Sequence, residues 1–280
     1  MSEYADPSVL VSTDWVNEHL SSGIKLVEVD VDTQQYVAGH IPGAVAFDWT
    51  TELQDQTSRD IISKENFEKL LGNAGISNSD EVVIYGDNNN WFAAYAFWVF
   101  KYYGHENVRL MNGGRSKWLD EEEKPLTTDV PTPTPTTYRV EGTDPSIRAF
   151  VQDVLAASKE QTANLVDVRS GDEFTGKVIA PPGMSETAQR AGHVPGAANV
   201  PWVNAVSSDG TFKSRADLEK IYLSDAGVDR GKDTIAYCRI GERSSHTWFV
   251  LRYLLGLDNV KNYDGSWTEY GSMIGVPIEK

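Results

Sequence analysis

The chain contains the same sequence pattern twice. His40-Ile41-Pro42-Gly43-Ala44 recurs as His193-Val194-Pro195-Gly196-Ala197, an offset of 153 residues. The mostly apolar run at residues 26–29 has a similar run at residues 165–168. A long internal repeat predicts two copies of one folding unit, each of roughly 125 residues.

A segment rich in proline and threonine separates the two copies. Residues 131–137 read Pro-Thr-Pro-Thr-Pro-Thr-Thr, a composition that favours an extended chain and cannot form a hydrophobic core. We therefore predict an N-terminal, non-catalytic domain over residues 1–126, a linker over 127–144 and a C-terminal, catalytic domain over 145–280.

Both halves alternate short apolar runs with helical patterns. Residues 26–29, 82–85, 165–168 and 234–237 predict strands, and their nearly continuous apolar character is typical of a parallel sheet covered on both faces. Residues 91–103 and 244–255 predict helices that end at Gly104 and Gly256. The predicted fold class is α/β, with two tandem domains that each contain a mostly parallel sheet flanked by helices.

The composition argues against several classes of partner. Lys and Arg number 25 against 41 Asp and Glu, a formal net charge of −16, which disfavours binding to nucleic acid or to an anionic membrane surface. The longest apolar run, residues 91–100, is about half of what a membrane span requires. The first residues also lack the basic and apolar parts of a signal peptide. We therefore expect a cytoplasmic protein with no nucleic-acid or membrane partner.

Cys238 is the one cysteine of the sequence. It excludes an intrachain disulfide, a Cys-x-x-Cys redox pair and a zinc site built on several cysteines. The five histidines show no i, i+4 pairing, and the glycine-rich nucleotide-binding motifs are absent from the sequence. Neither metal binding nor nucleotide-driven chemistry is expected.

The two copies differ at the end of the same strand. An offset of 152 residues places Gly86 of the first copy on Cys238 of the second. In the second copy the cysteine is followed by Arg239-Ile240-Gly241-Glu242-Arg243-Ser244, whereas the first copy continues with Asp87. This divergence predicts one working site, in the second copy, and one scaffold copy.

The predicted position of Cys238 favours a reactive thiolate. The loop after it joins a buried strand to a helix, and ligands of open α/β sheets bind beyond such strand ends. Loop amides and the helix N-terminus can converge on the sulfur, and Arg239 and Arg243 flank it. Lowering a thiol pKa of about 8.5 by roughly two units needs about 2.7 kcal/mol, and each hydrogen bond to a charged group supplies about 1.5–3 kcal/mol. The same loop could hold a small dianion, with Arg190 as a further candidate cation.

Two other interpretations of Cys238 stay open at this point. A lone cysteine is more often a small buried hydrophobic residue than a nucleophile. A cysteine phosphatase places an arginine six positions after the cysteine, but here Ser244 holds that position and Arg243 comes one place earlier. The shorter loop closes on a smaller target, which favours a sulfur atom bound to the cysteine over a whole phosphate.

These residues resemble the two-domain rhodanese family, in particular thiosulfate sulfurtransferases whose loop reads Cys-Arg-Ile-Gly-Glu-Arg-Ser. Tyr36-x-x-x-His40-Ile41-Pro42-Gly43-Ala44 is similar to the family's N-terminal signature. Residues 260–270, Val-Lys-Asn-Tyr-Asp-Gly-Ser-Trp-Thr-Glu-Tyr, are similar to its C-terminal signature. The resemblance covers nearly the whole chain and implies a tandem rhodanese-like fold.

The resemblance also implies a mechanism and a set of site residues. The Cys238 thiolate would take the outer sulfur of thiosulfate, release sulfite and pass the persulfide sulfur to a thiophilic acceptor such as cyanide. No metal or organic cofactor is implied, and the protein acceptor is unknown. The expected substrate-binding residues are the six that follow the cysteine, Arg239, Ile240, Gly241, Glu242, Arg243 and Ser244. Arg190, just before Gly192-His193, is added from the sequence as a further candidate cation.

Two alternatives for the activity stay open. Mercaptopyruvate sulfurtransferases share the fold and the cysteine but usually have a small uncharged loop, so Arg239 and Arg243 favour the dianion thiosulfate. Animal thiosulfate enzymes have a lysine where this chain has Ile240, and a basic residue where it has Asp172-Glu173. The non-catalytic alternative is a persulfide carrier that delivers sulfur to a partner protein.

Overall fold

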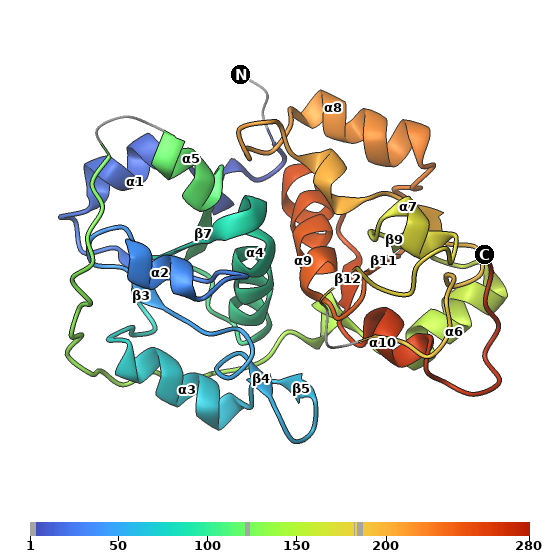
Figure 1. Cartoon of the computed structure of the whole chain (residues 1–280), viewed down its shortest axis with the longest axis horizontal. Helices are drawn as coiled ribbons and strands as arrows, with labels where there is room; N and C mark the ends of the chain where they lie inside the picture. The colour runs from blue at the N-terminus through green and yellow to red at the C-terminus, as the bar shows by residue number, and fades with distance from the viewer. Residues whose placement is uncertain (1–3, 121–123, 182, 184–186) are drawn as a thin grey trace. The chain divides into compact units, whose positions relative to one another are not determined.

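The computed structural model describes residues 4–120, 124–181, 183 and 187–280. This part of the chain divides into two compact units, which contain the helices and strands labelled in Figure 1. The N unit comprises residues 8–144 and 206–212, and the C unit comprises residues 4–7, 145–205 and 213–280. The boundaries 1–126, 127–144 and 145–280 stay predictions.

Each unit contains a five-stranded sheet, and the two sheets have the same topology. The strand order is β1-β7-β6-β2-β3 in the N unit and β8-β12-β11-β9-β10 in the C unit, so strands at equivalent sequence positions hold equivalent places. Neighbouring strands run parallel in both sheets. The predicted repeat, the α/β class and the parallel sheets are thereby confirmed.

The predicted strands lie within one residue of the observed ones. The N-unit sheet consists of β1 (Leu10–Val11), β2 (Lys25–Glu28), β3 (Val45–Ala46), β6 (Val82–Tyr85) and β7 (Val108–Met111). The C-unit sheet consists of β8 (Arg148–Ala149), β9 (Asn164–Asp167), β10 (Ala198–Asn199), β11 (Thr234–Tyr237) and β12 (Val260–Tyr263). A separate antiparallel pair joins β4 (Gln54–Asp55) to β5 (Asp60–Ile61).

Helices follow the strands in both units (Figure 1). The N unit has α1 (Thr13–His19), α2 (Gln34–Ala38), α3 (Lys64–Asn73), α4 (Asp87–Tyr102) and α5 (Gly114–Asp120). The C unit has α6 (Val151–Glu160), α7 (Gly171–Phe174), α8 (Arg215–Glu219), α9 (Glu242–Phe249) and α10 (Ser266–Tyr270). The π-helical turns Lys220–Asp225 and Val250–Leu254 continue α8 and α9. No helix of the described residues is both long and apolar enough to cross a membrane.

Local sequence signals explain where several helices begin and end. A serine side chain accepts a first-turn N–H at the start of α1, α3, α7 and α8, which satisfies a backbone donor that has no partner inside the helix. Gly104 and Gly256 follow their helices with left-handed φ values of 76° and 73°. The predicted glycine stops are therefore confirmed.

The N-unit sheet is covered by helices that pack on alternate side chains. Val83 and Tyr85 of β6 belong to a buried cluster with Val16 of α1, Tyr36 of α2 and Trp118 of α5. Successive strand residues point to opposite faces, and α4 also packs against β6 and β7. In the C unit, α6 packs on β9 and α9 packs on β11 and β12, so the carboxyl end of β11 leads directly into a buried helix.

The proline- and threonine-rich segment runs along the N unit. Between residues 124 and 144 the described backbone forms neither a helix nor a continuous strand. Thr127 exchanges two backbone hydrogen bonds with His40, and the N–H of Thr136 donates to the carbonyl of Gly72. The segment is thus held against the N unit by backbone hydrogen bonds, and its extended conformation stays a prediction.

Candidate active site

Cys238 lies at the carboxyl end of β11, and neighbouring elements hold its backbone. Its N–H donates to Oγ of Ser266 at 3.0 Å, and its carbonyl accepts the N–H of Trp267 at 3.0 Å. The Cys238 side chain is fully buried. The start of α10 therefore positions the residue that the sequence singles out as nucleophile.

Gly241 gives the loop its tight shape. Its φ of 97° lies in the left-handed region, which is costly for residues with a Cβ. A Cβ there would also lie 2.6 Å from Cα of Asp264. The N–H of Gly241 donates to Sγ of Cys238 at 3.1 Å. A glycine at this position thus lets the loop turn a backbone donor toward the sulfur.

Further polar groups lie close to the sulfur. The Cys238 S–H donates to Oε2 of Glu242 at 3.1 Å, and the N–H of Ile240 donates to the same oxygen at 3.2 Å. Oγ of Ser244 lies 3.6 Å from Sγ, and Oγ of Ser266 lies 3.9 Å from it. The side chain is buried among hydrogen-bonding groups, which does not fit the alternative of a purely apolar structural cysteine.

The expectation of a lowered thiol pKa was wrong for the resting state. Burial raises the pKa of Cys238, and the negative charge of Glu242 raises it further. The charge of Arg243 and hydrogen bonds from Ser244 lower the pKa, but by less than burial and Glu242 raise it. The sequence argument included the loop amides and the arginines, but not the contact between the thiol and a carboxylate of its own loop. The resting side chain is therefore a thiol.

Arg243 is held by an acidic partner from another element. Its Nη1 and Nη2 donate to the two carboxylate oxygens of Glu173 in α7, at 3.0 and 3.1 Å. Burial opposes ionisation of Glu173, but the hydrogen bonds and charge of Arg243 outweigh it and lower the carboxyl pKa. Paired in this way, the guanidinium is fixed in the buried loop with its charge largely balanced.

Glu173 is a residue whose role the sequence analysis missed. It was noted only as a departure from the basic residue of the animal enzymes. The pattern Ser170-x-x-Glu173 is a capping box, because Oγ of Ser170 accepts the N–H of Glu173 while the Glu173 carboxylate accepts the N–H of Ser170. That signal could have predicted a carboxylate fixed at the start of α7, but not its bond to Arg243.

Asn262 of β12 is a second residue to which no role was assigned. Its Oδ1 accepts the hydroxyl of Ser244 at 2.6 Å. Its Nδ2 donates to the carbonyl of Gly241 at 3.1 Å and to Oγ of Ser245 at 2.9 Å. One buried amide therefore ties the loop to the first turn of α9. It lies within the C-terminal signature, which was the only hint of its importance.

The structure brings most of the expected site residues together, but it engages Arg190 elsewhere. Six consecutive residues, from Arg239 to Ser244, form the loop beside the sulfur or the first turn of α9. The guanidinium of Arg190 donates instead to the backbone carbonyls of Tyr270, Gly271, Met273 and Val276. These bonds give Arg190 a part in holding the C-terminal segment, and its part in substrate binding stays a prediction.

The N unit has no room for a side chain at the position equivalent to Cys238. A Cβ on Gly86 would lie 2.0 Å from the carbonyl oxygen of Val29. The next side chain, Asp87, accepts the backbone N–H groups of Val31 and Asp32. The backbone of the first copy is packed too closely here for any nucleophile.

We expect Gly86→Ala to destabilise the protein by about 1–3 kcal/mol, because the added methyl must displace buried backbone. Chemical unfolding measures the change. Gly142→Ala is the matched control, since a Cβ there meets nothing within 4 Å and its φ is not in the left-handed range. Equal free energies of unfolding for the two variants would contradict the clash at Gly86.

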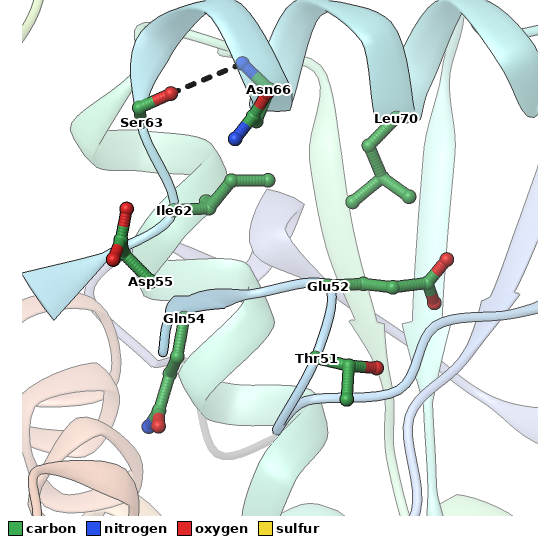
Figure 2. Close-up of a pocket in the computed structure, with 8 residues that line it drawn as sticks. All are labelled: Thr51, Glu52, Gln54, Asp55, Ile62, Ser63, Asn66 and Leu70. Carbon is green, nitrogen blue, oxygen red and sulfur yellow. Dashed lines mark hydrogen bonds between the residues drawn. The ribbon is translucent and has the colours of Figure 1, made fainter. Parts of the chain in front are cut away.

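The N unit contains a hollow of a different character. A cavity of about 200 Å³ lies between α3 and the segment around β4. Figure 2 shows Ile62 and Leu70 on one side of it, with Glu52 and Thr51 opposite. Its lining residues include neither a cysteine nor a basic side chain. The hollow therefore lacks the nucleophile and the cations that transfer from an anionic sulfur donor requires.

Comparison with known proteins agrees with this picture. The chain matches the rhodanese-like domain family over residues 12–121 and 150–273. It is 59% identical over 274 residues to the "Putative thiosulfate sulfurtransferase" of Saccharopolyspora erythraea, covering 97% of this chain and 96% of that one. It is 56% identical over 282 residues to the sulfur carrier protein TtuD of Thermus thermophilus, covering 99% and 98%. The solved structure of SseA, a 3-mercaptopyruvate sulfotransferase of Escherichia coli, matches with a TM-score of 0.81 at 29% identity, covering 93% and 99%.

Proposed function

The chain belongs to the rhodanese family, and on that premise we propose that it is a thiosulfate sulfurtransferase with Cys238 as the sulfur carrier. One observation supports this most directly. Sγ of Cys238 accepts a loop N–H at the carboxyl end of a parallel strand, and Arg239 and Arg243 belong to the same loop. A nucleophilic sulfur beside two fixed cations suits a donor that carries its transferable sulfur on an anion.

The reaction proceeds in two displacements. The Cys238 sulfur attacks the outer sulfur of thiosulfate, and the S–S bond of the donor breaks with its electron pair leaving on sulfite. Cys238 then holds a persulfide. A thiophile attacks the outer persulfide sulfur, and the Cys238 thiolate leaves with the electron pair of that S–S bond. With cyanide as the acceptor the product is thiocyanate.

The residues around Cys238 would stabilise the negative charge of this cycle. The Gly241 N–H and the nearby Ser244 hydroxyl are placed at the sulfur before reaction, so they need no reorganisation when charge develops there. Arg243, with Arg239, would attract the sulfonate end of the donor. The chain has one cysteine, so no second thiol of its own can discharge the persulfide as a disulfide.

Mercaptopyruvate is the competing donor, and SseA shows that the fold is found among enzymes named for it. Two buried arginines in the loop favour a dianion over that monoanionic keto acid. Transfer to a partner protein is the second candidate, supported by 56% identity to a sulfur carrier protein. A carrier would accept sulfur on Cys238 but turn over little with small thiophiles.

We expect thiosulfate to add the mass of one sulfur atom to the intact protein, and mercaptopyruvate to do so far less efficiently. The check is mass spectrometry after mixing with each donor, followed by kcat/KM for both. We expect a preference for thiosulfate of about tenfold or more, which corresponds to about 1.4 kcal/mol. A higher kcat/KM for mercaptopyruvate would contradict the donor assignment. Persulfide formation with negligible thiocyanate production would identify a carrier.

A further inference from the structure

The carboxylate of Glu242 lies where the proposed donor would have to bind. Its Oε2 accepts both the Cys238 S–H and the Ile240 N–H, at 3.1 and 3.2 Å. Its Oε1 lies 3.7 Å from Nη2 of Arg239 and 3.9 Å from Nε of Arg243. One side chain, 1% exposed, thus contacts the nucleophile, a loop amide and both loop cations. The two cations are the groups that the proposed function assigns to the sulfonate end of the donor.

We propose that Glu242 is an internal anion that closes the donor site of the resting enzyme, and that a sulfur-bearing dianion enters by replacing its carboxylate. This inference rests on the proposed function, because it concerns the same site. From the sequence we expected the backbone amides of this loop to contribute to the site. The proposal gives the Glu242 side chain a different role.

The release of Glu242 is coupled to activation of the thiol. The S–H bond of Cys238 breaks, its electron pair stays on sulfur, and the proton forms an O–H bond at Oε2 of Glu242. No electron is gained or lost, and the net charge of the site does not change. The sulfur becomes the thiolate that attacks the donor, while Glu242 becomes a neutral acid.

Neutralisation weakens the hold of Glu242 on its cationic neighbours. A neutral carboxyl no longer attracts the two guanidiniums by Coulomb interaction, so a protonated Glu242 releases Arg239 and Arg243 as the dianion arrives. The two cations then face the sulfonate. In the resting state the same carboxylate keeps the nucleophile protonated.

The other charged groups near the thiol have partners of their own. Glu173 is bound to Arg243, and Asp264, close to Gly241, is bound to Arg148 at 2.7 Å. His246, one turn along α9, is neutral because burial lowers its pKa to about 3. Among the residues that the structure describes, Glu242 is therefore the carboxylate that hydrogen-bonds the sulfur and whose protonation changes the charge around it.

The test measures thiosulfate binding in proteins that cannot cleave it. Cys238→Ser is compared with Cys238→Ser/Glu242→Gln by calorimetry between pH 5.5 and 8, in buffers of different ionisation enthalpy. We expect Cys238→Ser to bind thiosulfate more tightly as the pH falls. At the upper end of this pH range, it should take up close to one proton for each thiosulfate bound. The double variant is expected to bind about tenfold more tightly at pH 8 and to take up no proton. Cys238→Ser/Glu160→Gln, which changes an exposed glutamate at the end of α6, is expected to match Cys238→Ser.

A second readout uses the intact thiol. Iodoacetamide is uncharged, so its rate of reaction with Cys238 follows thiolate formation and not anion binding. We expect the midpoint of this rate against pH to move by at least about one unit to lower pH in Glu242→Gln, because the carboxylate that raises the thiol pKa is gone.

The outcomes separate this inference from the proposed function. Equal thiosulfate affinity in Cys238→Ser and its Glu242→Gln double variant, or no proton uptake by Cys238→Ser, overturns the role of Glu242. Proton uptake needs no glutamine variant, so it decides the question even if that variant does not fold. A wild-type protein that forms the persulfide while these tests fail keeps the proposed function. If no persulfide forms but thiosulfate still displaces Glu242, the inference holds for anion binding and the sulfur-transfer proposal fails.

Discussion

Replacing Cys238 by serine is expected to abolish thiocyanate formation from thiosulfate and cyanide. A serine hydroxyl is too weak a nucleophile at neutral pH to take up the sulfane sulfur, and the loss of a covalent nucleophile typically costs on the order of 10⁴- to 10⁶-fold in turnover. The rate of thiocyanate production at saturating cyanide measures this loss of turnover. The same variant should show no mass gain with thiosulfate.

The fold should survive this substitution. A hydroxyl can still donate to Glu242 and accept from Gly241, the groups that contact the thiol. An unchanged melting temperature and circular dichroism spectrum would therefore accompany the loss of activity. Glu160→Gln is the control and should retain full turnover. Turnover by Cys238→Ser within about tenfold of the wild type would exclude Cys238 as the sulfur carrier.

Replacing Arg243 by alanine is expected to lower both stability and thiosulfate turnover. Arg243 is 4% exposed and binds Glu173, which is 1% exposed, through two hydrogen bonds of its guanidinium. Removing one partner leaves a buried carboxylate without its counter-charge, and breaking such pairs costs about 3–5 kcal/mol. Arg243→Ala also removes one charged hydrogen bond to thiosulfate. We expect this loss to lower kcat/KM for thiosulfate by about 10- to 200-fold.

A double variant separates the two effects. Arg243→Met with Glu173→Gln removes both charges and keeps similar volumes, and replacing a buried ion pair in this way is often nearly neutral for stability. We expect chemical unfolding to show most of the stability restored, while kcat/KM for thiosulfate stays low. Recovery of full thiosulfate turnover in the double variant would make Arg243 a purely structural residue. Wild-type stability of Arg243→Ala would contradict the structural importance of the pair.

The sequence was sufficient for the architecture because the relevant signals are local and repeated. The duplicated His-x-Pro-Gly-Ala turns and apolar runs predict two similar units, and the two sheets have the same strand order. Gly104 and Gly256 end helices because a residue without Cβ adopts the left-handed conformation there at low cost. Each such signal depends on a few consecutive residues.

The sequence also singled out the loop after Cys238 as the candidate site, but not the contacts made within it. Cys238 after β11 could be proposed because a strand, a cysteine, two arginines and a helix follow one another along the chain. Glu173, 70 positions before Arg243, carries no sign in the sequence that it forms an ion pair with it. Asn262 likewise contacts the loop only because β12 lies beside β11 in the sheet.

The repeat and the α/β class were thus determined by the amino-acid sequence itself, which was also enough to single out Cys238 as the candidate nucleophile. The protonation state of Cys238 and the partners of its arginines were decided by the tertiary structure. The physical reason is that a pKa depends on the balance between burial and charges a few ångströms away. Composition counts those charges, but it does not state their distances. Two arginines in the loop predicted a thiolate, but burial of the sulfur, together with one carboxylate 3.1 Å from it, favours the thiol instead.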